Sequence, residues 1–115
     1  MATALTVTDP TTSTCCSPFT GGIMGDDEAT TLAAKFKAIG DPTRLRLLSM
    51  VAAADGGEAC VCDMNEQLDL SQGTVSHHLG ILVKAGLLTR TRRGTWSYYA
   101  LVPGAFPALA ATLQV

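Results

Sequence analysis

Residues 70–88, LSQGTVSHHLGILVKAGLL, form the stretch that decides the fold. Ser71 is a favoured residue for capping a helix N-terminus, and Gly86 is a typical residue at the end of a helix. Between them, Val75, Leu79 and Leu82 recur at the spacing of one helix face, which leaves polar residues on the other sides. The stretch therefore predicts a helix that starts near residue 72, buries an apolar stripe and exposes a polar surface.

The segments on either side predict a helix-turn-helix followed by a β-hairpin. Residues 62–70, CDMNEQLDL, show a short helical pattern with Met64 and Leu68 on one side. Two helices joined this tightly indicate a helix-turn-helix. Residues 87–102, LLTRTRRGTWSYYALV, switch to the alternation that is typical of strands, around a turn at Arg93-Gly94.

Two helices are predicted before this unit and one after it. The first starts at three acidic residues from Asp26 and ends at Gly40, and the second has Asp41 as its cap and Pro42 at its first position. The last, within residues 103–115, contains no charged residue, which favours a partner surface. The apolar faces expected in these three helices are Leu32, Phe36 and Ile39; Leu45, Leu48, Val51 and Ala52; and Phe106, Leu109 and Leu113.

This order of elements predicts a mainly α (α+β) fold, a winged helix-turn-helix with a β-hairpin wing and flanking N- and C-terminal dimerisation helices. Residues 1–25 are rich in Thr, Ser, Gly and Pro and predict a flexible N-terminal arm, which carries Cys15-Cys16. Residues 26–115 are expected to form the winged helix-turn-helix domain for DNA binding and dimerisation.

Composition narrows the class of protein. A chain of 115 residues with 47% hydrophobic residues is long enough for one domain with its own core. No secretory signal or membrane span is evident, so we expect a cytoplasmic protein with no membrane partner. Thiols stay reduced in that compartment, and the four cysteines therefore favour metal binding or redox chemistry over structural disulfides.

Charge is distributed unevenly along the chain. The net charge is −2, yet every acidic residue lies at or before Asp69, while Lys84 and three arginines follow it. A basic segment without acids is a typical electrostatic footprint for nucleic acid, although surface scatter produces the same pattern. With the helix-turn-helix, it predicts binding to double-stranded DNA through Ser71, Gln72, Thr74, Ser76 and His77 on the helix and Arg90, Arg92 and Arg93 at the hairpin.

Cys60-Val61-Cys62 precedes the first helix of the helix-turn-helix. If the segment is extended and the helix begins near Cys62, both sulfurs can reach one ion; if all three residues are helical, the side chains diverge. A helix N-terminus also lowers the pKa of a thiol, which favours the thiolate. Buried core cysteines and a redox-active pair are the alternatives.

The segments FKAIGDPTRLRLL, CVCDM, LSQGTVSHHLGILVKAGLL and RRGTWSYYAL together resemble the ArsR/SmtB family of metal-responsive bacterial repressors. The resemblance runs from about Asp26 to Leu101 and implies a homodimer that leaves its operator DNA when a metal ion binds. The Cys-Cys pair of the arm resembles a subgroup of arsenic-responsive members. The zinc site that some members carry on the C-terminal helix needs Asp, His and Glu, which residues 103–115 lack.

The same resemblance implies a sulfur site that is incomplete near the helix-turn-helix. Arsenic-responsive relatives place a third cysteine three residues after the second, and this chain has Asn65 there. Cys15 and Cys16 would then join Cys60 and Cys62. Three thiolates suit arsenite or antimonite, all four suit cadmium or lead, and a thiol–disulfide switch is a further alternative.

Catalysis is not expected. The chain has no CxxC motif, no Gly-rich phosphate loop and no cysteine followed six positions later by arginine, as thiol-based arsenate reductases often have. We therefore expect no enzyme activity and no organic cofactor.

Overall fold

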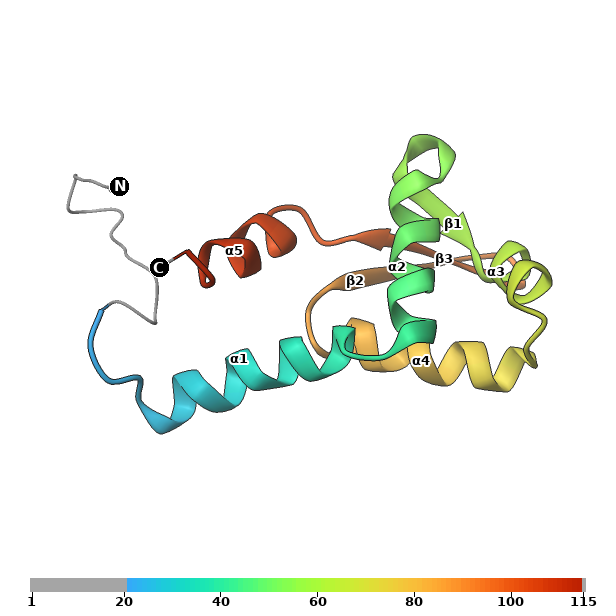
Figure 1. Ribbon diagram of the computed structural model, residues 1–115. Helices are drawn as coiled ribbons and strands as arrows, with labels where there is room; N and C mark the ends of the chain where they lie inside the picture. Colours follow the sequence, from blue (N-terminus) through green and yellow to red (C-terminus); the bar gives the residue numbers. More distant parts are fainter. Residues whose placement is uncertain (1–20, 115) are drawn as a thin grey trace.

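The computed structural model describes residues 21–114, and these form a winged helix-turn-helix (Figure 1). The predicted order of helices and the hairpin is confirmed, with one additional short strand. The elements are α1 (Asp26–Ile39), α2 (Pro42–Ala53), a 3₁₀ turn (Asp55–Gly57), β1 (Glu58–Cys60), α3 (Val61–Leu68), α4 (Gln72–Lys84), β2 (Leu88–Arg93), β3 (Trp96–Leu101) and α5 (Ala105–Ala111).

The helix starts follow the capping chemistry that the sequence predicts. The Asp41 carboxylate accepts a hydrogen bond from the backbone N–H of Arg44 at 3.1 Å, and Pro42 occupies the first turn of α2. This hydrogen bond lowers the pKa of Asp41, because it favours the charged carboxylate. The Ser71 hydroxyl accepts from the N–H of Thr74 at 3.1 Å and starts α4 in the same way.

The three strands form one antiparallel sheet in the order β1-β3-β2. Arg93 pairs with Trp96, so the turn of the hairpin consists of Gly94 and Thr95, one residue later than predicted. Gly94 has a φ of 64°, a left-handed conformation that glycine adopts without strain. The predicted wing is confirmed, and its tip lies one position further along.

The strand β1 was not predicted, because three residues are too few to display alternation. Its pairing with β3 joins Glu58 to Ala100 and Cys60 to Tyr98. The segment that leads into α3 is therefore fixed by the sheet. This pairing also places Cys60 at the point where a strand becomes a helix.

The core lies between α2, α3, α4 and the sheet. Val75, Leu79 and Leu82 of α4 are fully buried, as predicted. In α2 the prediction was partly wrong, because Leu45 and Ala52 are exposed and Leu47 is buried with Leu48 and Val51. Two helices and the sheet pack against α2 and cover more of its surface than one apolar stripe. The buried face of α2 is therefore turned from the predicted one.

The first and last helices lie at the end of the molecule opposite α3 (Figure 1). Of the 14 residues of α1, only Ala38 is buried. In α5, Leu109 is buried and Phe106 is half-buried, whereas Leu113 follows the helix and is exposed. Within residues 21–114, no helix has the length and apolar character needed to cross a membrane.

Replacing Leu47 by alanine is expected to lower the free energy of unfolding by about 2–5 kcal/mol, because the change leaves a cavity in the core. Leu45→Ala is the matched control in the same helix, since it removes the same atoms from a side chain that is 54% exposed. We expect a change below about 1 kcal/mol for this control. Urea unfolding followed by circular dichroism measures both, and equal losses would contradict the assignment of the buried α2 face.

Candidate nucleic-acid interface and thiol pair

The polar residues predicted to read DNA are exposed on α4 or at its start. Buried Val75 and Leu79 fix the rotation of the helix and leave its polar sides in solvent. The exposed residues are Ser71, Gln72, Thr74, Ser76 and His77. Hydroxyl, amide and imidazole groups of this kind are able to bond to base edges and phosphates.

Two cationic side chains hold α4 against the first two helices. Arg44 Nη1 lies 3.0 Å from Nδ1 of His78, and the same guanidinium donates to the backbone carbonyls of Ala38 and Lys37 at the end of α1. Lys35 Nζ donates to the carbonyl of Ala85 at 2.8 Å, just after α4. His78 is half-buried, and its contact with Arg44 had no signal in the sequence because 34 residues separate them.

Alternation along β2 separates the three predicted wing arginines onto two faces of the sheet. Arg90 and Arg92 share a face with buried Leu88, whereas Arg93 points to the opposite face. In the register, Arg90 lies beside Tyr99, which is buried on that same face. Arg90 and Arg92 therefore point from the wing toward α4.

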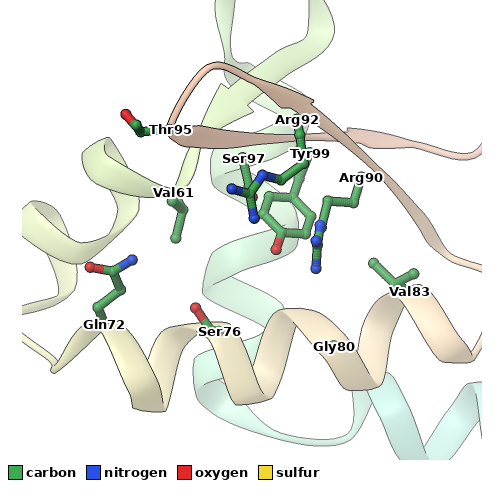
Figure 2. Close-up of a pocket in the computed structure, with 10 residues that line it drawn as sticks. All are labelled: Val61, Gln72, Ser76, Gly80, Val83, Arg90, Arg92, Thr95, Ser97 and Tyr99. Atoms are coloured by element: carbon green, nitrogen blue, oxygen red, sulfur yellow. The ribbon is translucent and has the colours of Figure 1, made fainter.

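A groove of about 250 Å³ separates α4 from the wing. Figure 2 shows Gln72 and Ser76 rising from α4 on one side and Arg90 and Arg92 approaching from the hairpin on the other. Among the described residues, no acidic side chain lines this groove, which we call the wing groove. Its lining residues are Val61, Gln72, Ser76, Gly80, Val83, Arg90, Arg92, Thr95, Ser97 and Tyr99.

On the other face of the sheet, Arg93 is engaged with Glu58 of β1. Its Nη1 and Nη2 donate to the two carboxylate oxygens at 2.6 and 2.9 Å, and its guanidinium lies 4.8 Å from the centroid of the Tyr98 ring. The hydrogen bonds to Glu58 raise the pKa of Arg93. Contact of Arg93 with DNA stays a prediction, and such a contact would compete with this ion pair.

Cys60 and Cys62 meet at the junction of β1 and α3. Cys60 has extended backbone angles and caps the helix, and its sulfur accepts a hydrogen bond from the N–H of Cys62 at 3.3 Å. A disulfide joins the two sulfurs. Of the two alternatives, the structure has the one in which Cys60 is extended and the two sulfurs meet, with the helix starting at Val61 rather than near Cys62. Cys60 is buried and Cys62 half-buried.

The other two predicted metal ligands lie outside the described residues. Within residues 21–114, no group of three or more His, Cys, Asp or Glu side chains is placed to hold a metal ion. Cys15 and Cys16, predicted as the additional ligands, lie in the part of the chain that the structure does not describe. Asn65, one turn into α3, has a buried side-chain oxygen without a hydrogen-bond partner among the described residues.

The sequence of this chain is similar to that of known transcription regulators. Residues 41–90 match the family described as bacterial regulatory protein, arsR family. An uncharacterised HTH-type transcriptional regulator of Methanocaldococcus jannaschii is 48% identical over 67 residues, which are 58% of this chain and 73% of that protein. A putative arsenical resistance operon repressor of Halobacterium salinarum is 44% identical over 85 residues, covering 74% of this chain and 69% of the relative.

The solved structures include a homodimeric winged helix-turn-helix DNA-binding domain from Mycobacterium bovis, a possible ArsR-family transcriptional regulator. It superposes with a TM-score of 0.63 at 25% identity, and the match covers 77% of this chain and 83% of that one. The similarity extends beyond the helix-turn-helix to most of the described fold.

The thiol pair generates a prediction that uses the variant Cys15→Ser/Cys16→Ser, in which Cys60 and Cys62 are the only remaining cysteines. After mild oxidation with diamide, we expect its intact mass to fall by two hydrogens, because the two sulfurs lie side by side. Reductant should restore the mass. An unchanged monomer mass after oxidation, with linked dimers instead, would contradict the intrachain pairing.

Proposed function

We propose that this chain, which belongs to the arsR family of bacterial regulatory proteins, represses transcription as a homodimer and releases its operator DNA when a thiophilic ion binds its cysteines. Family membership makes it a transcription regulator with a DNA-binding winged helix, not an enzyme. The operator, the inducing ion and the dimer belong to the proposal.

One observation carries the DNA-binding proposal. The exposed polar side of α4 and the guanidinium groups of Arg90 and Arg92 border the same groove, and no carboxylate lies among the residues that line it. An α-helix with exposed polar side chains fits the major groove of DNA, and arginines beside it bind the phosphate backbone or the minor groove. A protein net charge of −2 does not oppose this, because the acidic residues lie elsewhere along the chain.

The homodimer is supported by the exposed helices and by the relative that is described as homodimeric. In the single chain only Ala38 of α1 is buried, and Leu113 after α5 is exposed. Two copies related by a two-fold axis would present two α4 helices to successive major grooves of an inverted-repeat operator, about one helical turn apart.

Arsenite or antimonite is the proposed inducer. Relatives at 41–45% identity include arsenical resistance operon repressors, and the sulfurs of Cys60 and Cys62 converge closely enough to ligate one ion once reduced. Cys15, Cys16 or both would complete the shell. Three thiolates fit the pyramidal geometry of trivalent arsenic, and four would fit cadmium or lead, the alternative inducers.

Release follows from the position of the pair. Cys60 ends β1 and caps α3, the first helix of the helix-turn-helix, and α3 packs against α4. An ion that draws Cys60 and Cys62 toward the arm would therefore shift α3 and, through it, α4. The ion must bind the DNA-free form more tightly than the DNA-bound form, and the coupling is reciprocal. A coupling of about 1–3 kcal/mol corresponds to roughly 5- to 150-fold weaker DNA binding.

A second candidate function is redox control, which the disulfide between Cys60 and Cys62 favours. In this case an oxidant such as a peroxide removes two electrons and two protons from the thiols, and the S–S bond forms. The bond then takes the place of the ion in reshaping the start of α3.

The inducer is tested by fluorescence anisotropy on a duplex selected from random sequences for tight binding. Arsenite, added under reducing conditions, is expected to release DNA from the unmodified protein and to fail with Cys15→Ser/Cys16→Ser, because two thiolates make a weak site. Cadmium, lead and zinc are titrated in parallel. If the unmodified protein and the variant both release the DNA at the same arsenite concentration, the arm contributes no ligand.

Redox control is tested on Cys15→Ser/Cys16→Ser with the same duplex. If the disulfide regulates binding, hydrogen peroxide releases the DNA, dithiothreitol restores binding, and a further Cys62→Ser change removes the response. Unchanged binding after complete oxidation, verified by intact mass, would exclude a regulatory disulfide.

A further inference from the structure

We propose that the ion pair of Glu58 with Arg93 connects the thiol pair to the wing, so that a change at Cys60 and Cys62 also moves the tip of the β2–β3 hairpin. The inference rests on the proposed function, in which the thiol pair controls DNA binding. It adds a second connection beside the packing of α3 on α4. Three observations support it: the shared face of the sheet, the geometry of the ion pair and the short length of β1.

The residues involved lie on the outer face of the sheet, which points away from the wing groove. In the antiparallel register, Cys60 pairs with Tyr98 and Glu58 pairs with Ala100. Residues directly opposite one another share a face, with Cβ atoms about 4.5–5.5 Å apart. The guanidinium of Arg93 lies over the Tyr98 ring, 4.8 Å from its centroid. Tyr98 therefore has the thiol pair on one side and the cation of the wing tip on its ring.

The ion pair closes the connection between the wing tip and β1. Nη1 and Nη2 of Arg93 donate to Oε1 and Oε2 of Glu58 at 2.6 and 2.9 Å, and two parallel hydrogen bonds fix the direction of the guanidinium as well as its distance. The Arg93 side chain is 55% exposed. An ion pair this exposed adds little to stability, but its paired geometry sets the position of one strand relative to the other.

The strand β1 carries both the carboxylate and the thiol pair. It contains three residues, with Glu58 at its start and Cys60 at its end, and Cys60 also caps α3. Conversion among the dithiol, disulfide and ion-bound forms changes the position of Cys60. Because the strand is so short, Glu58 moves with Cys60 and takes the guanidinium of Arg93 along. Packed side chains and hydrogen-bonded pairs in direct contact are the means by which sites in a protein are coupled.

The connection is specific to one arginine of the wing. Among the strands that the structure describes, Glu58 is the only acidic residue. Arg90 and Arg92 lie on the opposite face of β2, away from this carboxylate. Replacing Glu58 therefore disconnects Arg93 from β1 and leaves the other two arginines in their surroundings.

The wing tip carries its own reporter. The chain contains a single tryptophan, Trp96, which pairs with Arg93 in the register and is 45% exposed. Quenching of its fluorescence by acrylamide measures how accessible this indole is. A displacement of the wing tip therefore becomes measurable without DNA and without a metal ion.

The first test uses the variant Cys15→Ser/Cys16→Ser, in which diamide removes two hydrogens from Cys60 and Cys62 to form the disulfide. Intact mass verifies complete conversion. We expect acrylamide quenching of the tryptophan to differ between the dithiol and disulfide forms. Adding Glu58→Gln should shrink this difference, because the neutral amide cannot form the bidentate ion pair.

Two further variants separate the connection from general effects of charge and folding. Glu66→Gln removes the same charge from an exposed position of α3 that makes no ion pair within residues 21–114, and it should keep the full difference. Arg93→Met breaks the pair from the other side and should act like Glu58→Gln, even if one of the two proved unstable. Thermal unfolding checks that each variant folds.

The second test measures DNA binding by the four-cysteine chain under reducing conditions, with and without arsenite. Glu58→Gln should reduce the ratio of the two dissociation constants by about 2- to 30-fold, the range for residues that carry coupling between sites. Glu66→Gln should leave the ratio unchanged.

The outcomes distinguish the two proposals. If neither arsenite nor oxidation changes DNA binding by the unmodified protein, the proposed function fails, and the tryptophan comparison alone decides whether the thiol pair and the wing are connected. If quenching is the same in the dithiol and disulfide forms, or differs equally with and without Glu58→Gln, the ion pair does not connect them. Either result overturns the inference even where arsenite releases the DNA.

Discussion

The rotation of α4 about its own axis is the constraint on which the rest of the interface depends. Val75, Leu79 and Leu82 are fully buried, and turning the helix would expose all three to water. Each buried leucine or valine contributes about 1.5–3 kcal/mol through removal from water, which exceeds the energy of the exposed polar contacts. The apolar stripe therefore sets the direction of the polar residues, and Arg44 and Lys35 hold the helix by its side and its end.

The pleat of β2 is a second constraint, because it turns Arg90 and Arg92 toward α4 and Arg93 to the opposite face. A strand has no means of placing Arg92 and Arg93 on the same face, so adjacent cations meet different surroundings. Arg90 and Arg92 border an open groove without acids, while Arg93 lies over Tyr98 and pairs with Glu58. Identical side chains in one short run thus acquire different chemistry from strand geometry alone.

Sequence reasoning predicted the features whose causes are local. The caps at Asp41 and Ser71, the stripe of α4 and the alternation of the hairpin each depend on residues close in sequence, and all are found in the structure. The features that were missed depend on residues far apart. The strand β1 exists only through its pairing with β3, and Glu58 meets Arg93 across 35 positions.

The buried face of α2 was misjudged for a related reason. A single stripe of Leu45, Leu48 and Val51 satisfies helical periodicity, yet the true face turns toward Leu47 because several elements cover it. In the thiol pair, the convergence of the two sulfurs was predictable from an extended residue followed by a helix start. The remaining ligands were inferred from a family resemblance, and that inference stays a prediction.

Val61 has a place in two surfaces at once. It is the single residue between Cys60 and Cys62, and its side chain also lines the wing groove beside α4. The thiol pair and the wing groove are therefore direct neighbours, since the single residue Val61 borders both. A cysteine motif that replaces Val61 would change the groove wall at the same time.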